Sequence, residues 1–330
     1  MHNAFGNVFR ISLSGESHSP VMAVEIQGVP AGIPLAIEDF MPHINRRRGG
    51  RIGTTSRVER DVPEFVRGVE DGLTTGTTLK ILFRNENTEP AAYSGFSDMP
   101  RPGHADWVRM VKYGTGSLAS GGGMFSGRMT LPLVAAGVVA RKAISPVTVR
   151  ARLVEVGGMP VCGEDDPVLD GFMEQVAADG DSVGGVVECV CDGVPAGLGE
   201  PFFDPLESML SHIVFAVPGI RGIEFGDGFA ASRMRGSMHN DPIVDRSGHT
   251  ARNGAGGING GISNGNPLVF RVAVKPSSSI SRPQKTFNMA TGRMEELCVT
   301  GRHDVCFALR VPVVIESVAA IVLCDAMLHV

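Results

Sequence analysis

Apolar residues recur at every second position in residues 77–83 and 268–274, which is the pattern of a β-strand with one buried face. Shorter apolar-rich segments predict further strands at 8–13, 21–27, 65–69, 186–191 and 223–225.

Longer apolar segments predict helices at 37–48, 131–144, 168–178, 206–217 and 312–328. Strands and helices follow each other without the regular spacing of βαβ units. We see no linker, low-complexity tract or repeat in the sequence. The pattern therefore predicts one α/β or α+β domain that spans residues 1–330.

Composition narrows the class of protein. The 330-residue chain has a net charge of −5, which argues against a nucleic-acid binder. Its six cysteines lack CxxC or zinc-ligand spacing, so we interpret them as reduced thiols of a cytoplasmic protein. The N-terminus has no apolar signal region. The apolar run at 311–330 contains Glu316 and Asp325, so we expect a core helix and no membrane contact.

A glycine-dense loop at 253–265 precedes the strand at 268–274. Backbone without Cβ atoms can lie close to a flat or anionic ligand. The far end of the strand carries Lys275 and the serines at 277–279, which offer an ammonium group and three hydroxyls suited to a phosphate. Taken alone, the segment better fits a flexible hairpin followed by a serine-rich turn.

Three motifs place a histidine beside other polar groups. GESH at 15–18 lies in a turn, where Gly, Asn, Asp and Pro are more usual, and RPGHAD at 101–106 contains a Pro-Gly turn. GRHD at 301–304 precedes the last apolar helix, and charges near a core have shifted pKa values. A packed turn histidine and a salt-bridged helix entry are the structural alternatives for the first and third motifs.

Arginines are concentrated at the end of the first predicted helix and in the loop after it, at Arg46, Arg47, Arg48, Arg51 and Arg57. Cations at a helix C-terminus also stabilise the helix. In an acidic chain, the continued positive run fits a small dianionic or carboxylated ligand. A second glycine-rich loop, at 120–128, leads into the helix at 131–144, whose N-terminus is a natural anion site.

Two further segments give weak signals. Residues 226–231 match the dinucleotide pattern GxGxxA, but no clear helix follows and no βαβ frame surrounds them, so we reject that interpretation. Residues 233–241 are a polar connector, and His239 has no partner spacing that would indicate a metal site. We expect no metal.

Six motifs occur in order along the chain: GESH, RRRGGR, RPGHAD, GGISNG at 260–265, KPSSSI at 275–280 and GRHD. Together with the region 194–207, they resemble the chorismate synthase family over nearly the whole chain. The resemblance implies an α+β fold, a β-α-β sandwich with an internal pseudo-repeat, and a homotetramer. It also implies a lyase of the shikimate pathway of aromatic amino-acid biosynthesis. The implied reaction is the 1,4-anti elimination of phosphate from 5-enolpyruvylshikimate 3-phosphate to give chorismate, with reduced FMN required and no net redox change.

The resemblance assigns roles to residues of this chain. It implies that His18 is the general acid near the leaving phosphate, that His104 lies beside the pyrimidine end of the flavin, and that Asp304 assists proton removal from flavin N5. Substrate carboxylates and phosphate are best bound by guanidinium groups, and the candidates are Arg47, Arg48, Arg51, Arg101, Arg128 and Arg302. The implied FMN contacts are Met124, Phe125, Ser126, Pro218, Gly219, Gly260, Lys275, Pro276, Ser277, Ser278, Ser279 and Arg302.

The chain departs from the family pattern in the second glycine-rich loop. The family commonly has Arg-Ser-Ser-Ala-Arg there, whereas residues 124–128 read Met-Phe-Ser-Gly-Arg. An arginine and a serine that would contact the flavin are thus replaced by Met124 and Phe125. The loss of one charge-assisted hydrogen bond costs about 1.5–3 kcal/mol, or about one to two decades of affinity. The loop after Arg48 is also shorter than in many members, so Arg51 matches a family arginine only approximately.

Two alternatives remain. The first is another FMN-dependent enzyme that acts on a phosphorylated acid, and the second is a non-enzymatic binding protein, for example an RNA binder. The retained His18, His104 and Asp304 argue against the first, and the acidic balance with few aromatic residues argues against the second. Because the sequence shows no NAD(P)H domain, we expect NADPH to act through a separate flavin reductase.

Overall fold

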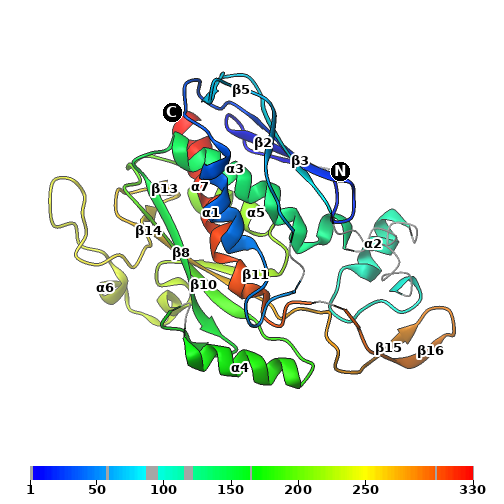
Figure 1. Cartoon of the computed structure of the whole chain (residues 1–330). Helices are drawn as coiled ribbons and strands as arrows, with labels where there is room; N and C mark the ends of the chain where they lie inside the picture. The colour runs from blue at the N-terminus through cyan, green and yellow to red at the C-terminus, as the bar shows by residue number, and fades with distance from the viewer. Residues whose placement is uncertain are drawn as a thin grey trace.

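Two five-stranded antiparallel sheets enclose a helical interior in the computed structural model (Figure 1). The structure describes residues 3–56, 59–86, 96–114, 122–163, 166–301 and 303–329. The first sheet has the order β1 (Ala4–Phe5), β2 (Arg10–Ser14), β3 (Val21–Gln27), β7 (Leu79–Arg84) and β4 (Glu64–Arg67). The second has the order β11 (Ile220–Phe225), β14 (Leu268–Val274), β10 (Gly185–Asp192), β8 (Thr148–Val156) and β9 (Met159–Pro160).

Four helices lie between the sheets: α1 (Ile37–Arg47), α3 (Thr130–Ala143), α5 (Leu206–Val214) and α7 (Pro312–His329). Helix α3 packs on β3, helix α7 packs on β8, and the two helices pack against each other. Buried apolar side chains from both halves of the chain form one continuous core. The α+β sandwich implied by the family resemblance is therefore confirmed.

The two halves of the chain repeat one topology. The first half runs β2-β3-α1-β4-β7-α3 and the second runs β8-β10-α5-β11-β14-α7, with smaller elements inserted. The sheet orders β2-β3-β7-β4 and β8-β10-β14-β11 then correspond strand for strand. This is the internal repeat that the sequence pattern did not reveal, because the repeat conserves the order of elements and not the residues.

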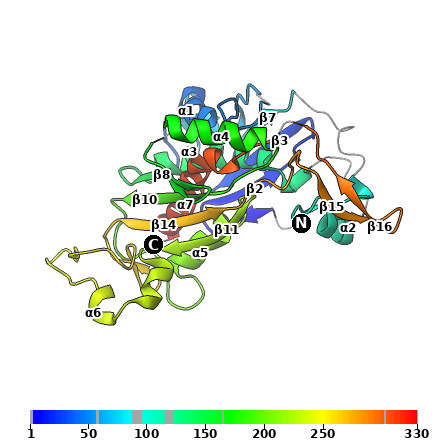
Figure 2. The same ribbon diagram turned by 90° about the horizontal axis from the view of Figure 1, so that it is seen from below.

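The remaining elements are inserted into or project from this frame. They are β5 (Val69–Glu70), β6 (Leu73–Thr74), α2 (Asp106–Tyr113), α4 (Pro167–Ala178), α6 (Gly236–His239), β12 (Ile258–Asn259), β13 (Ile262–Ser263), β15 (Gln284–Asn288) and β16 (Arg293–Leu297). Figures 1 and 2 both show α2 beside the β15–β16 hairpin at one end of the molecule, with α6 at the other. The segment 96–106, which contains RPGHAD, begins beside the turn of this hairpin, since the amide of Met289, directly after β15, donates to the Asp98 carbonyl at 2.7 Å.

Most predicted elements are present with shifted ends. The strand predicted at 65–69 is wrong as one element, because Gly68 adopts φ +86 and separates β4 from β5. The strand predicted at 8–13 begins later, at Arg10. The sequence did not predict helix α2 or the β15–β16 hairpin. Most apolar residues of α2 are exposed, and the hairpin lacks a sustained apolar face. Strand β11 pairs antiparallel with β14, which supports the rejection of a dinucleotide fold at 226–231.

Helix α7 is long and apolar enough to cross a membrane by length and composition, but 83% of its apolar window is buried inside the protein. Its two acidic residues are both buried and both paired. Glu316 accepts hydrogen bonds from Arg46, Arg141 and the Ala151 amide at 2.7–2.8 Å. Asp325 accepts from the amides of the residues 7–9 loop at 2.7–3.0 Å. These carboxylates fasten other elements to the central helix.

Helices α3 and α7 are in close contact at Gly137, where an added Cβ would lie 2.5 Å from the Ser317 Cα. Alanine favours helix formation over glycine by about 1 kcal/mol, but here it would force two backbones apart. We expect Gly137→Ala to lower the free energy of unfolding by about 1–3 kcal/mol, measured by urea denaturation.

Gly171 on α4 is the matched control, because an added Cβ there meets nothing within 4 Å. Gly171→Ala should raise the free energy of unfolding by about 0.5–1 kcal/mol. Equal stabilisation by both substitutions would show that α3 and α7 are not in close contact.

Candidate active site

The GESH turn joins β2 to β3 and is held to neighbouring loops. Ser19 Oγ accepts the Glu16 amide at 2.8 Å, which closes the turn. Ser17 is buried, and its amide donates to the Gly123 carbonyl at 3.4 Å, so the turn lies against the glycine-rich loop. Asn85 Nδ2 donates to the Ser19 carbonyl at 2.6 Å from the end of β7. His18, half-buried, is thereby positioned between two loops and the first sheet.

A buried cluster of charges lies beside this turn. Arg128 donates to Asn85 Oδ1 at 2.8 Å and lies 2.7 Å from Asp61 Oδ1 and 3.1 Å from Glu59 Oε2. Arg47 donates to the other oxygen of Asp61 at 2.8 Å. All four charged side chains are at most 8% exposed. Two acids thus hold two arginines in place. Each buried charge has a partner of opposite sign, as charges in a protein interior require.

Arg47 keeps unused hydrogen-bond donors. Its Nε and Nη1 are buried and have no hydrogen-bond partner among the described residues. Burial lowers the pKa of Arg47 to about 9, against the opposing effect of Asp61. A guanidinium in this state gains strongly from an anionic ligand that accepts from the free donors.

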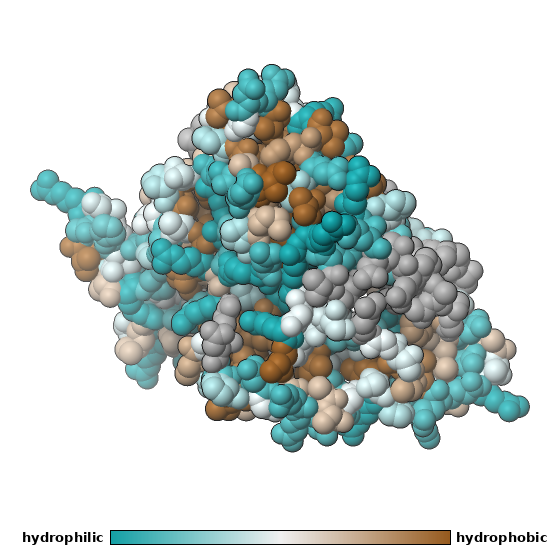
Figure 3. Space-filling view, viewed as in Figure 1, coloured by the Kyte–Doolittle hydropathy of each residue, from teal (hydrophilic) through white to brown (hydrophobic). Residues whose placement is uncertain are grey.

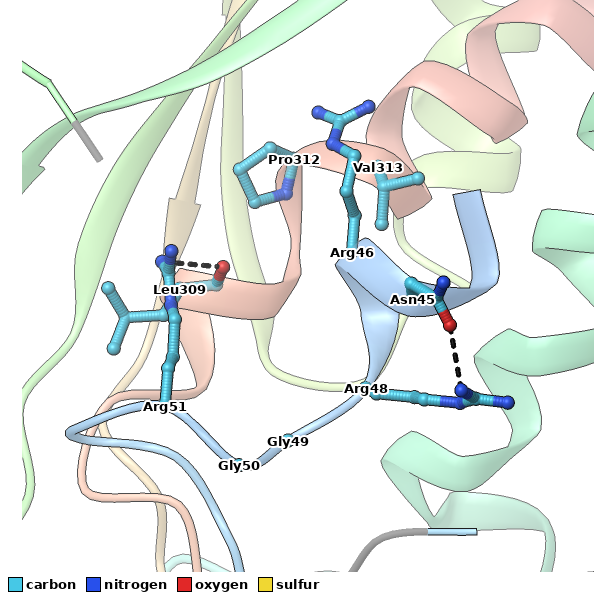
Figure 4. A pocket seen from close by; sticks show the side chains of 9 residues that line it. All are labelled: Asn45, Arg46, Arg48, Gly49, Gly50, Arg51, Leu309, Pro312 and Val313. Carbon is cyan, nitrogen blue, oxygen red and sulfur yellow. Dashed lines mark hydrogen bonds between the residues drawn. The ribbon is translucent and has the colours of Figure 1, made fainter. Parts of the chain in front are cut away.

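Arg48 and Arg51 turn away from Arg47. They line a cavity of about 310 Å³ between the end of α1 and the start of α7 (Figure 4). Arg48 Nη1 donates to Asn45 Oδ1 at 2.7 Å, and Arg51 Nη2 donates to the Leu309 carbonyl at 3.1 Å. The structure therefore does not bring the three predicted substrate arginines of this run into one cluster.

Asp304 of GRHD is connected to the same arginine cluster. Its Oδ1 accepts the Thr55 amide at 2.9 Å, and both oxygens lie 3.0–3.1 Å from Arg310 Nη1. Arg310 Nε donates to the Arg47 carbonyl at 2.8 Å. His303 is half-buried, and burial lowers its pKa. Arg302, expected to bind both substrate and flavin, lies outside the described residues, as does Arg57.

The RPGHAD motif forms a buried polar group at the start of α2. Arg101 donates through Nε and Nη2 to the two oxygens of Asp106 at 2.7 and 2.8 Å, and His104 Nδ1 lies 2.6 Å from Asp106 Oδ1. Burial lowers the pKa of His104, although Asp106 opposes the shift. The pKa of Asp106 is held well below its usual range by Arg101 and His104, which outweigh burial. Burial thus favours the neutral imidazole of His104, and the contact of Nδ1 with Asp106 fixes the orientation of the ring.

The predicted phosphate segment meets this motif. Lys275 Nζ and Ser278 Oγ donate to the Gly103 carbonyl at 3.2 and 2.8 Å, and Arg101 Nη1 donates to Ser279 Oγ at 2.9 Å. The segment also includes Pro276 and Ser277. The Lys275 amide donates to the Gly219 carbonyl at 2.9 Å, so Pro218 and Gly219 lie alongside. An ammonium, a guanidinium and several hydroxyls in one place fit the phosphate of a mononucleotide.

The loop with Met124, Phe125 and Ser126 and the loop with Pro218 and Gly219 both lie against the ring of Phe307. Ser126 Oγ accepts the Arg128 amide at 3.2 Å, Met124 packs against the core, and Phe125 is exposed. Added Cβ atoms at Gly127 and Gly219 would meet the Phe307 ring at 3.0 and 3.4 Å. Phe307 therefore separates the two loops and holds them close to each other.

Gly260 and Lys275 lie at opposite ends of strand β14. The β12–β13 hairpin precedes β14, whereas Lys275 follows it, and a seven-residue strand is about 20 Å long. Gly260 is exposed, and an added Cβ would meet nothing within 4 Å. The extended strand therefore separates the glycine loop from Lys275, and the FMN contact of Gly260 stays a prediction.

Several residues of the site had no role in the sequence interpretation, namely Glu59, Asp61, Asn85, Asp106, Arg109, Phe307 and Arg310. One feature of the sequence could have indicated Glu59 and Asp61. Buried arginines need carboxylate partners, and Glu59 and Asp61 directly follow the arginine run. No sequence pattern indicates Phe307, which acts through contacts with loops far away in the chain. Among the described residues, no group of three or more His, Cys, Asp or Glu side chains is arranged to hold a metal ion.

Comparisons with known proteins find relatives along nearly the whole chain. The family model described as chorismate synthase matches residues 9–328. A chorismate synthase of Chitinophaga pinensis is 54% identical over 99% of this chain and 96% of its own length. A chorismate synthase of Korarchaeum cryptofilum is 41% identical over 97% of this chain and 96% of its own length. A crystal structure of chorismate synthase superposes with a TM-score of 0.77 at 26% identity, and covers 98% of this chain and 93% of that one.

Proposed function

The chain belongs to the chorismate synthase family, and from this we propose that the assembled loops form one site for reduced FMN and 5-enolpyruvylshikimate 3-phosphate. The protein is an enzyme, a carbon–oxygen lyase that acts on a phosphate ester and gives chorismate. We infer that residues 1–330 act as a single catalytic domain. The observation that carries the proposal is the Arg47 guanidinium, which is buried beside the GESH turn with two donors unused.

In the proposed complex, the substrate's anionic groups accept hydrogen bonds from arginines. Arg47 and Arg128 are the nearest candidates to His18, since Asn85 joins Arg128 to the turn that carries it. Arg101 and Arg302 complete the proposed set. Arg48 and Arg51 reach this site only if the loop at 49–50 rearranges, because they face a separate cavity in the structure.

The residues around Lys275 fit a flavin mononucleotide. We propose that Lys275 and Ser277–Ser279 hold its phosphate and ribityl end, with Pro218, Gly219 and Met124–Ser126 along the ring. Bound reduced FMN supplies electron density that assists expulsion of phosphate. In this proposal His18 would protonate the leaving phosphate, His104 would support the charge of the reduced ring, and Asp304 would assist proton removal from flavin N5.

One anaerobic assay tests this function. The protein is mixed with dithionite-reduced FMN and 5-enolpyruvylshikimate 3-phosphate, and chorismate is followed by absorbance. Chorismate and phosphate should appear in equal amounts. Release of phosphate without chorismate would favour the alternative, another FMN-dependent enzyme that acts on a phosphorylated acid.

His104 gives a prediction with a pH signature. We expect His104→Gln to lower turnover by about 100-fold or more, because a fixed neutral imidazole is lost from the flavin end of the site. It should also change the pH dependence of stability. The folded-state pKa of His104 lies below its ordinary value, so the unfolded chain binds the proton first as the pH falls below about 6.5, and stability is lost.

Urea denaturation at pH 7.5 and 5.5 measures that effect. The loss of stability on acidification should be smaller in His104→Gln than in the wild type. An identical loss in both proteins, together with wild-type turnover, would remove His104 from the proposed roles.

We also propose a homo-oligomer, and specifically a tetramer. Large apolar side chains are exposed at Phe202, Phe203, Ile243 and Val244, and Figure 3 shows hydrophobic surface on the loop that projects at the left. Exposed apolar residues of this kind are typical of protein interfaces. If Gly260 contacts flavin as the family resemblance implies, it does so from a neighbouring copy. Light scattering of the wild type and of Phe203→Asp tests the assembly, and a wild-type monomer would contradict it.

The source of electrons is a separate proposal. We infer that this cytoplasmic enzyme depends on an external flavin reductase that uses NADPH. Turnover in air with NADPH and FMN, with no second protein present, would contradict it.

A further inference from the structure

Helix α2 buries one basic residue, Arg109, while most of its apolar side chains are exposed. Arg109 is 6% exposed, whereas Trp107, Val108 and Val111 on the same helix are each more than half exposed. Burial of a guanidinium is unfavourable unless charged or polar groups compensate. The group that lies opposite Arg109 is the loop at 122–126.

The guanidinium of Arg109 lies directly over Gly123. An added Cβ at Gly123 would meet Arg109 Nη2 at 2.7 Å, Cζ at 3.0 Å and Nη1 at 3.1 Å, and Gly123 has φ +52. Both the contact and the backbone conformation require glycine. The glycine-rich loop is thus shaped to receive this side chain.

Arg109 also lies where three motifs meet. The Gly123 carbonyl accepts a hydrogen bond from the amide of Ser17 in the GESH turn. Glu16 of that turn and Asp106 of RPGHAD both favour the charged form of Arg109, whose pKa is lowered first by burial and also by Arg101. The guanidinium therefore faces the same loops as the proposed flavin site.

The adjacent residue in the loop is Met124, where the family pattern has an arginine. Met124 packs against the core and offers no hydrogen-bond donor from its side chain. We propose that Arg109 is a flavin-binding residue, which supplies from helix α2 the guanidinium that position 124 lacks. It binds an anionic oxygen of FMN. This inference rests on the proposed function, because it needs FMN in the site.

The test is equilibrium titration of the full-length protein with oxidised and dithionite-reduced FMN, followed by flavin fluorescence and absorbance. Arg109→Ala should raise the Kd for reduced FMN by about 10- to 100-fold, as expected for one charge-assisted hydrogen bond. Met124→Arg in the Arg109→Ala background should recover most of that affinity. Lys112→Ala, an exposed cation on the same helix, should leave the Kd unchanged.

A purely structural role for Arg109 gives a different result. If Arg109 only balances the charge of Glu16, then Glu16→Gln restores the Arg109→Ala protein and Met124→Arg does not, which overturns the proposal. An unchanged Kd in Arg109→Ala also overturns it. If Arg109→Ala does not fold, Arg109→Lys should bind FMN more tightly than Arg109→Gln, and equal affinities would again reject the proposal.

Riboflavin identifies the end of the flavin that Arg109 binds. A defect that persists with reduced riboflavin places Arg109 at the ring, and a defect seen only with FMN places it at the phosphate. Both outcomes support the flavin contact. Failure of the wild-type protein to bind FMN would instead overturn the proposed function itself.

Discussion

Asp304→Asn should lower turnover by about 100- to 10,000-fold while FMN still binds. Asparagine keeps the shape of the side chain. Its amide oxygen can still accept the hydrogen bond from the Thr55 amide, which is 2.9 Å long in the wild type. It cannot accept a proton as the carboxylate does, so the proposed proton removal at flavin N5 fails. Steady-state kinetics with saturating reduced FMN measure the loss, and FMN titration measures binding separately.

Part of the effect of Asp304→Asn will be structural. Arg310 loses its ion pair, made at 3.0 Å, but keeps its bond to the Arg47 carbonyl. We expect a loss of about 1–3 kcal/mol in stability, without unfolding. Asp245→Asn is the control, since Asp245 pairs with His249 in an exposed loop. Wild-type turnover in Asp304→Asn would refute the assigned role.

Asp61→Asn should produce the largest loss of stability, about 3–5 kcal/mol in urea denaturation. Asp61 pairs with both Arg47 and Arg128, at 2.8 and 2.7 Å, and all three side chains are buried. Without the carboxylate, the buried Arg47 loses its ion-pair partner in the cluster. The substitution should also weaken substrate binding, because Arg47 loses its orientation.

The pH dependence of Asp61 has a defined sign. Burial alone would raise the pKa of Asp61, but Arg47 and Arg128 outweigh burial and hold it below the ordinary value. The stability from this carboxylate is therefore present above the unfolded-state pKa of about 4, and is lost as the pH falls through the folded-state pKa. Asp61→Asn should make the acid limb of the stability curve shallower.

Glu64→Gln is the matched control for Asp61→Asn. Glu64 pairs with Arg84 at 2.7 Å, as close as the Asp61 pairs, but both side chains are exposed. Solvent screens such a pair, so its removal should leave the free energy of unfolding near the wild-type value. Equal losses in Glu64→Gln and Asp61→Asn would show that burial is not what makes the Asp61 cluster strong.

Local signals in the sequence were sufficient for many elements. The alternation in Leu268–Val274 predicts β14 with its observed bounds, because a half-buried strand must place apolar residues on one face. Glycine after the first helix predicts its end near Arg47. The same rules missed α2, where the charged Asp106 and Arg109 are buried with Met110 and the other apolar residues are exposed, so that the hydrophobic pattern is misleading.

The site was only partly predictable. Motif order placed His104, Lys275 and Ser278 among the candidates, and the structure brings them together through the Gly103 carbonyl and the Arg101 side chain. The arginine run read as one cluster in the sequence. In the structure, Arg47 points inward and its neighbours point elsewhere, since successive helical residues lie about 100° apart around the axis.

The sequence by itself determined most strands of the two large sheets, the core helices, the family and the chemical types of its candidate residues, because these depend on residues that are close in the chain or on recognisable motifs. Only the tertiary structure decided which charges meet. Asp61 joins Arg47 to Arg128, Phe307 lies between Gly127 and Gly219, and an extended β14 separates Gly260 from Lys275. The physical reason is that burial and pairing of charges depend on contacts between distant segments, which form only when both sheets close over the helices.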